Sequence, residues 1–117
     1  MTKTIRGFLV LEFAAFITAG LTHFGVLVHG YDHRKAGTAE SVIALVLLTG
    51  LILSFIRSQS TRGIGLAVQG FALLGTLVGI VTIIIGIGPR TIPDITYHIL
   101  IVAVLIWGLV KTGRTRQ

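Results

Sequence analysis

The sequence predicts an all-α integral membrane protein, a bundle of four transmembrane helices in antiparallel, up-down order with short loops. Two observations support this. First, 53% of the 117 residues are hydrophobic, 12% are charged and the mean hydropathy is +0.93, which is more apolar than a soluble domain of this size tolerates. Second, four nearly uncharged runs are long enough to cross a hydrocarbon core of about 30 Å, which takes roughly 20 helical residues.

The four expected spans leave no room for a separate soluble domain. They cover residues 7–28, 39–56, 65–88 and 95–110. The second and fourth are short, so we expect helix tilt or local thinning of the bilayer. Short connections favour antiparallel neighbours. We therefore expect residues 1–117 to form a single transmembrane domain.

The first span carries one acidic residue, Glu12. A signal peptide would also begin after basic residues, but this apolar run is too long and Glu12 interrupts it. An ionisable group inside a membrane helix is a functional candidate, so Glu12 is the expected proton-transfer residue. Gln69 of the third span is expected at the same depth, as a hydrogen-bond partner. His23 lies eleven residues further on nearly the same helical face, about 16 Å away at helical rise. The two residues are candidates for a proton path to the outer side, bridged by water or by hydroxyls such as Thr18 and Thr22.

The second and fourth spans have recognisable helix starts. Thr38 is placed to cap the second span, with Glu40 in its first turn. Pro93 suits the first turn of the fourth span, and Asp94 suits the positive end of its helix dipole. Glu40 and Asp94 are therefore either ordinary helix-start residues or members of a site.

The third span has one face of small residues, spaced alternately by three and four. Small residues let membrane helices approach closely. The face is expected to pack within the chain, or to contact a second subunit or a flat macrocycle, and a homo-oligomer is expected. Its members are Ala72, Gly75, Gly79, Thr82 and Gly86.

The basic residues predict that both termini face the cytoplasm, because cations gather on the inner side of membrane proteins. We expect a multi-pass protein of a bacterial-type inner membrane. The net charge of +6 is then mostly topological, with the lipid bilayer as partner and no nucleic acid, since no basic patch is interleaved with aromatic residues. The inner side has Lys3, Arg6, Arg57, Arg62, Lys111, Arg114 and Arg116, and the outer side has Arg34, Lys35 and Arg90.

This orientation collects most of the chemically active side chains near the outer face. Many of them could ligate a metal, orient a ligand or move a proton. His98 is the most informative, because it lies about one turn inside the fourth span, where an unpaired imidazole has to lose its hydration. The set is His29, Tyr31, Asp32, His33, Glu40, Asp94, Tyr97 and His98.

Haem b is the leading cofactor prediction. Histidines on two facing helices are a usual way for a membrane bundle to hold haem. We take His29 and His98 as the axial ligands, with His23 in reserve. Arginine pairs strongly with carboxylates, so the outer cations are expected to meet the propionates. These cations are Arg34, Lys35 and Arg90.

A metal ion is the close alternative to haem. His29 and His33 are four residues apart, so their rings share a face if the first helix continues through Gly30. With His98 and Glu40 they form a nitrogen and oxygen ligand set that suits zinc, copper or iron. A further interpretation is that the histidines are hydrogen-bonded structural residues and hold no cofactor.

Three functions follow from these patterns. The leading one is cofactor binding for electron transfer, sensing or a redox step. The second is a proton-coupled transporter or channel that uses Glu12, and the third is a structural accessory subunit. Nothing in the sequence decides whether the protein is an enzyme. The chain has no cysteine, which excludes disulfides, thiolate metal sites and thiol catalysis.

Overall fold

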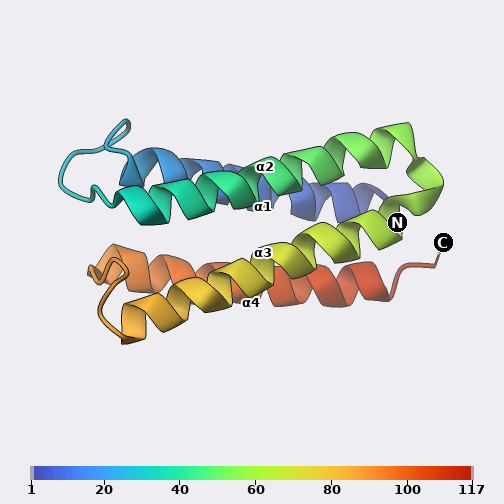
Figure 1. Ribbon diagram of the computed structural model, residues 1–117. Coiled ribbons are helices and arrows are strands. Elements are labelled where there is room, and N and C mark those ends of the chain that lie inside the picture. Colours follow the sequence, from blue (N-terminus) through green and yellow to red (C-terminus); the bar gives the residue numbers. More distant parts are fainter. Residues whose placement is uncertain (1, 117) are drawn as a thin grey trace.

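The computed structural model describes residues 2–116 and contains four long α-helices (Figure 1). All four are long and apolar enough to span a membrane, which confirms the prediction of an all-helical chain with four such helices. They are α1 (Thr2–His23), α2 (Arg34–Ile56), α3 (Thr61–Ile84) and α4 (Ile92–Gly113), with a short 3-10 helix, η1 (Ser58–Ser60), between α2 and α3.

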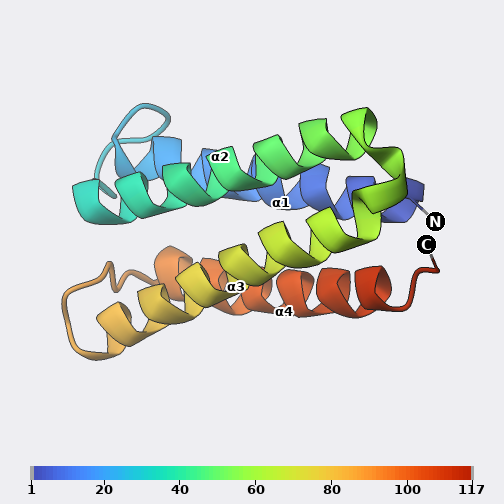
Figure 2. The ribbon, with the colours of Figure 1, turned by 45° about the vertical axis from the view of Figure 1, so that its right-hand side comes forward.

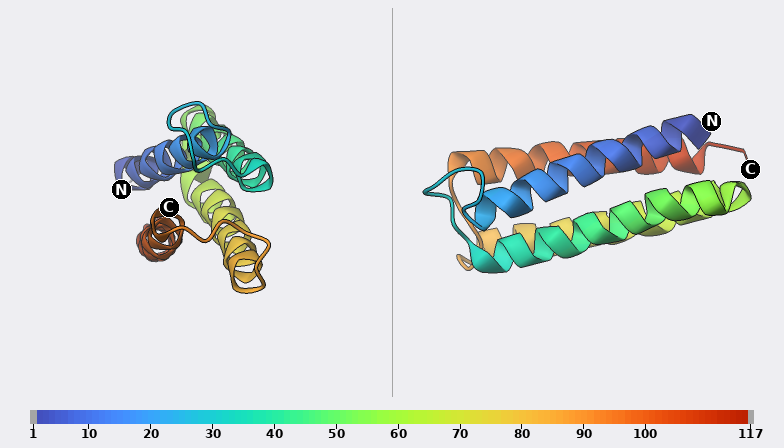
Figure 3. Two further views of the ribbon diagram at one scale, coloured as in Figure 1. Left: turned by 90° about the vertical axis from the view of Figure 1, so that its left-hand side faces the viewer. Right: turned by 90° about the horizontal axis from the view of Figure 1, so that it is seen from above.

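The helices lie in two layers. Helix α1 lies beside α2 and α3 beside α4 in two different views (Figures 1 and 2). Seen from above, α1 lies over α4 and α2 over α3 (Figure 3). The 24–33 and 85–91 loops lie at one end of the bundle, which we name the loop end. The start of α1, η1 and the end of α4 lie at the other, which we name the terminal end.

The core takes apolar side chains from all four helices, whereas the outward faces carry large exposed hydrophobic residues. Leu45, Leu74 and Ile99 are 63%, 64% and 65% exposed. Helices that are apolar all round suit a membrane environment better than water. The buried core cluster consists of Ile5, Leu9, Phe16, Ile43, Ala44, Leu47, Ala72, Ile101 and Leu105.

Helices α1 and α3 end earlier than the expected spans 7–28 and 65–88, and for the same reason. Gly25 and Gly86 adopt positive φ angles of 76° and 91°, which a glycine accepts without steric cost. After α1, Val26 N–H donates to Leu21 O and Gly25 N–H donates to Thr22 O, both at 3.0 Å. This pair of bonds is a Schellman motif. An equivalent pair at Gly86 ends α3.

Helices α2 and α4 begin at Arg34 and Ile92, earlier than the expected spans 39–56 and 95–110, so Glu40 does not lie in the first turn of α2. His33, not Thr38, caps α2, because its Nδ1 accepts from Ala36 N–H at 3.1 Å. Thr38 is already helical, and its hydroxyl donates to Arg34 O at 2.9 Å. At α4 the predicted first-turn positions of Pro93 and Asp94 are confirmed, in a capping box with Thr91.

The small-residue face of α3 packs against the other helices over much of its length. Ala72 is in the core. A Cβ atom at Gly75 would lie 2.9 Å from Ile43 of α2, and one at Gly79 would lie 3.3 Å from His98 Nε2 of α4. Close packing within the chain therefore explains these three positions.

Candidate functional site

His23, the last residue of α1, bridges two carboxylates from different helices. Its Nδ1 is hydrogen-bonded to Glu40 Oε1 of α2, and its Nε2 lies 2.7 Å from Asp94 Oδ1 of α4. His23, Glu40 and Asp94 are only 4%, 6% and 6% exposed. We name these three residues the histidine network. It joins three helices near the loop end.

Local structure holds each member of the network in place. The Schellman motif ends α1 directly after His23, whose carbonyl oxygen accepts from His33 N–H at 2.8 Å. Asp94 uses its second oxygen, Oδ2, to accept from the hydroxyl of Thr91 in the capping box. The Asp94 carboxylate therefore caps the start of α4 and also contacts His23 of α1. Asp94 is both a helix-start residue and a member of the site.

The network holds one proton more than a neutral histidine would supply. Two hydrogen bonds to carboxyl groups need two hydrogen atoms, and a neutral imidazole provides one. The additional proton lies on His23 or on one of the two carboxyl groups. With that proton, the three groups together carry one net negative charge in a buried position, where charge is costly unless it is paired.

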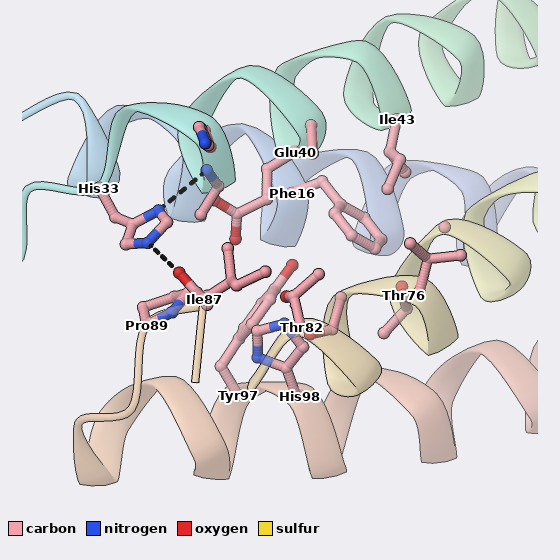
Figure 4. Close-up of a pocket in the computed structure, with 17 residues that line it drawn as sticks. Phe16, His33, Glu40, Ile43, Thr76, Thr82, Ile87, Pro89, Tyr97 and His98 are labelled. Atoms are coloured by element: carbon pink, nitrogen blue, oxygen red, sulfur yellow. Dashed lines mark hydrogen bonds between the residues drawn. The ribbon is translucent and has the colours of Figure 1, made fainter. Parts of the chain in front are cut away.

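A cavity of about 180 Å³ adjoins the network between α2, α3 and α4 (Figure 4). Glu40 lines it, and its Oε2 is buried without a hydrogen-bond partner among residues 2–116. The buried hydroxyl of Tyr97 likewise has no partner in the described part of the chain. One oxygen of Glu40 therefore serves the network and the other is available to the cavity.

His98 also lines this cavity, with a defined protonation pattern. Its Nδ1 lies 2.7 Å from the backbone carbonyl of Asp94. A carbonyl only accepts, so Nδ1–H donates and the neutral ring has its lone pair on Nε2. No residue that the structure describes is hydrogen-bonded to this Nε2. A histidine held in this way is typical of metal ligation, where the other nitrogen donates to a carbonyl.

The remaining histidines are less suited to ligation. His33 accepts from Ala36 N–H through Nδ1 and donates from Nε2 to Ile87 O at 3.0 Å, so both nitrogens are occupied. His29 is exposed in the 24–33 loop. Because α1 ends at His23, the expected helical i, i+4 pair of His29 and His33 does not form.

The outer cations take different positions. Arg90 donates to Ile83 O and Ile84 O at 2.7 Å each, which caps the carbonyl end of α3. Lys35 is exposed and lines the cavity, and Arg34 is exposed. Among residues 2–116, no group of three or more His, Asp or Glu side chains is arranged to hold a metal ion.

A larger hollow of about 570 Å³, which we name the groove, lies on the other side of the network, between α1 and α4. His23, Asp94 and Tyr97 line its polar end, and small residues of α1 line most of its length. Tyr97 borders this groove and the 180 Å³ cavity. The network thus separates two hollows. The residues of α1 that line the groove are Leu11, Ala14, Ala15, Thr18, Ala19, Thr22 and His23.

Glu12 lies in a second buried polar cluster towards the terminal end. Glu12 and Gln69 are both 0% exposed. A Cβ atom at Gly108 would lie 2.1 Å from Gln69 Oε1 and 2.8 Å from Glu12 Oε2, so both oxygens converge on one point beside α4. Neither oxygen has a hydrogen-bond partner among residues 2–116. A protonated Glu12 would satisfy Gln69 Oε1.

The other half of the Gln69 amide is fully used. Its Nε2 donates to Gly65 O at 3.1 Å and to Thr112 Oγ1 at 2.9 Å. These bonds fix the amide so that its oxygen faces Glu12. The expected shared depth of Glu12 and Gln69 is therefore matched by convergence in space. Gly108, which makes room for both oxygens, carried no distinctive signal in the sequence.

The sequence predicts His23 as a reserve ligand, as part of a proton path from Glu12, or as a hydrogen-bonded interior histidine, whereas the structure makes it the centre of the network. The available signal was its position at the level of Glu40 and Asp94, close to a glycine that can end a helix. The structure brings His23, Glu40, Asp94, Tyr97 and His98 to one region and leaves His29 on the surface.

Comparisons with protein-family models, with curated proteins and with solved structures found no match.

Proposed function

We propose that the protein is a proton-coupled membrane transporter for a small solute, in which the histidine network binds and releases the proton. The observation that carries this proposal is the buried ring of His23, with a carboxyl group on each nitrogen. Buried ionisable residues between membrane helices mark proton relays and ion pathways. Gain or loss of the additional proton changes the bonds that hold α1 to α2 and α4, which links protonation to helix packing.

The groups that face His23 favour a site of this kind. Glu40 and Asp94 contact the ring directly, the ring of His33 lies 6.3 Å away between centroids, and Tyr97 borders both hollows. The single ionisable residue of α3 is Arg62, which donates to Gly113 O at the terminal end. No cation from α3 therefore offsets the two carboxylates.

Glu12 would complete a proton path across the bundle. Thr18 and Thr22 line the groove that runs from the level of Glu12 to His23. Their hydroxyls donate to the carbonyls of Ala14 and Thr18 at 2.7 and 2.8 Å, so their oxygens can accept from water in the groove. The proposal places the four helices across a bilayer, with both termini in the cytoplasm and Glu12 nearer the inner side.

A pH jump on proteoliposomes adsorbed to a solid-supported membrane tests the proposal without knowledge of the solute. Proton binding inside the membrane displaces charge and gives a transient current. We expect this current in the wild type and in His29→Ala, which alters an exposed loop histidine, and its loss in His23→Gln. An unchanged current in a folded His23→Gln protein would remove the network from the mechanism.

A second candidate function is the binding of haem b or of a zinc, copper or iron ion, and His98 is the residue that favours it. Its Nδ1–H is held by a carbonyl, which leaves the Nε2 lone pair towards the cavity. The second ligand would be His29 or Glu40. An absorption spectrum after haem-replete expression, together with metal analysis of wild type and His98→Ala, tests this. A Soret band or bound metal that depends on His98 would support it.

A further inference from the structure

We propose that the 180 Å³ cavity is a binding site for a small primary ammonium ion, of which methylammonium is the simplest organic example. This inference names the solute class of the proposed transporter and rests on that function for its link to the proton. Binding itself can be measured at equilibrium, without transport. Failure of binding and failure of transport are therefore distinguishable.

Hydrogen-bond acceptors predominate among the polar groups of the cavity. Glu40 Oε2 and His98 Nε2 both accept. The hydroxyls of Thr76 and Thr82 give their hydrogens to carbonyls of their own helix, at 2.7 and 2.6 Å, so they offer lone pairs to a ligand. The Tyr97 hydroxyl can serve either way. A ligand that satisfies this lining has to be rich in N–H donors.

The charge of the site favours a cation over a neutral donor. Glu40 is 6% exposed, and the network to which it belongs carries one net negative charge when it holds its additional proton. An ammonium group at Oε2 would neutralise that charge where desolvation makes it most costly. Lys35 is the cation on the cavity lining, and it is exposed, so its ammonium group can remain in water.

The size and the apolar walls of the cavity fit a ligand with a short alkyl part. A site that admits one water needs only roughly 10–15 Å³ of comparable volume, and this cavity has about 180 Å³. Phe16 and Ile43 line it opposite Thr82 and His98 (Figure 4). Phe16 meets Tyr97 edge-on, with 6.1 Å between ring centroids, and the two rings offer π faces to a cation.

Glu40 links the cavity to the proton. Its Oε1 is hydrogen-bonded to His23 Nδ1 and its Oε2 faces the cavity, so an ammonium ion and the additional proton both interact with the charge of the same network. Each weakens the binding of the other. We therefore expect methylammonium to bind more weakly as the pH falls. This competition is what an exchange of proton for cation requires.

The test follows the imidazole ¹⁵N signals of His98 during titration of the purified full-length protein with methylammonium chloride. We expect a saturable shift of the Nε2 signal. Tetramethylammonium chloride has the same charge but no N–H donor, and should bind at least ten-fold more weakly. Potassium chloride controls for ionic strength. Zinc chloride asks whether the site instead prefers a metal ion.

Two variants make the test specific. Glu40→Gln should abolish the methylammonium shift. Because loss of Glu40 can also disturb folding, Tyr97→Phe removes only one oxygen and should weaken binding several-fold, whereas Tyr31→Phe, whose ring lines the groove and not the cavity, should bind as the wild type does.

Three results would overturn the proposal. They are equal shifts with tetramethylammonium, an undiminished shift in folded Glu40→Gln and Tyr97→Phe proteins, and a shift with zinc but none with methylammonium.

Discussion

His23 has no hydrogen-bonding atom to spare, because both ring nitrogens meet a carboxyl group. Asp94 is in a similar position, with one oxygen on His23 and the other in the capping box of α4. Glu40 differs, since one of its oxygens lacks a partner among residues 2–116. His23 and Asp94 therefore use all their polar side-chain atoms to hold the three helices together, whereas Glu40 also presents an oxygen to the cavity.

Replacement of His23 by alanine should destabilise the protein strongly. The substitution leaves two buried carboxyl groups without their shared partner, and removal of one member of a buried ion pair costs about 3–5 kcal/mol. The free energy of unfolding can be followed in mixed micelles through Trp107, the single tryptophan, which packs edge-on against Phe8 with 5.2 Å between centroids.

The matched control for this substitution is His29→Ala. His29 is exposed in the 24–33 loop, and exposed substitutions usually change stability by no more than about 0.5 kcal/mol. Equal losses in the two variants would mean that the bridge of His23 contributes no more than a surface histidine does.

Glu12 gives a second prediction about a single carboxyl group. If Glu12 is protonated and donates to Gln69 Oε1, then Glu12→Gln keeps a donor at that place and should retain folding to within about 1 kcal/mol. The variant has no carboxyl group to release or bind a proton at this place, so we expect it to lose the current that follows a pH jump. Unfolding curves and the current measured on one preparation separate these effects. A full current in Glu12→Gln would exclude Glu12 from the proton path.

The level of each site residue along the bundle could be predicted from the sequence, but its partner could not. Span positions placed Glu40, Asp94, Tyr97 and His98 near one face. Which of four histidines bridges the carboxylates depends on the rotation of α1 and on where that helix ends, and a shift of one residue turns a helical side chain by about 100°. Haem, metal, solute and oligomer stay predictions.

Helix ends explain most differences between expected spans and observed helices. Apolar runs such as residues 24–28 and 85–88 look like parts of spans in a hydropathy profile. Glycines at positive φ end α1 and α3 before these runs. A hydropathy profile indicates whether a segment is apolar enough to lie in lipid. It does not indicate where the helix ends, because that depends on local backbone geometry.

Substitution of Gly25 by alanine tests the turn after α1. A left-handed conformation costs an alanine about 1–2 kcal/mol, and the new Cβ would also lie 2.6 Å from Asp32 Oδ2. Gly30→Ala is the matched control, because Gly30 has a φ of 102° but its Cβ would meet no described atom within 4 Å. Thermal unfolding should rank Gly25→Ala as the less stable variant. The reverse order would contradict the packing of Asp32 against this turn.

A methyl group at Gly108 should push α4 away from α1 and α3. The Cβ of Gly108→Ala would lie 2.1 Å from Gln69 Oε1, and overpacking of a tight interior costs about 1–3 kcal/mol. Gly70→Ala is the control on α3, where a Cβ would meet no described atom within 4 Å and alanine is the better helix former. Equal stability of the two variants would show that Glu12 and Gln69 do not converge on α4.

The two ends of the bundle carry different features. The loop end holds the histidine network and the cavity, and the groove extends from the network along α1 to Leu11. The terminal end holds contacts of arginines with backbone carbonyls, such as Arg6 with Ser54 O at 2.6 Å. The apolar character of the helices could be predicted from composition, and their number from the four nearly uncharged runs. The two hollows could not, because a cavity depends on how side chains of all four helices mesh.

The predicted orientation can be tested because the chain has no native cysteine. We expect a membrane-impermeant maleimide to label His29→Cys in intact cells, and to label Ser60→Cys only after the membrane is opened. Both positions are exposed and lie at opposite ends of the bundle. The opposite labelling pattern would invert the proposed topology, and labelling of both in intact cells would argue against a sealed four-span arrangement.

The hydrogen bond from His33 Nε2–H to Ile87 O spans 54 positions of the chain and ties the 24–33 loop to the 85–91 loop. Both residues also line the cavity. The two loops, one on each pair of helices, therefore meet beside the cavity. The bond between them has a net worth of only about 0.5–1.5 kcal/mol, so a rearrangement of the loops would alter the cavity lining at a small cost in free energy.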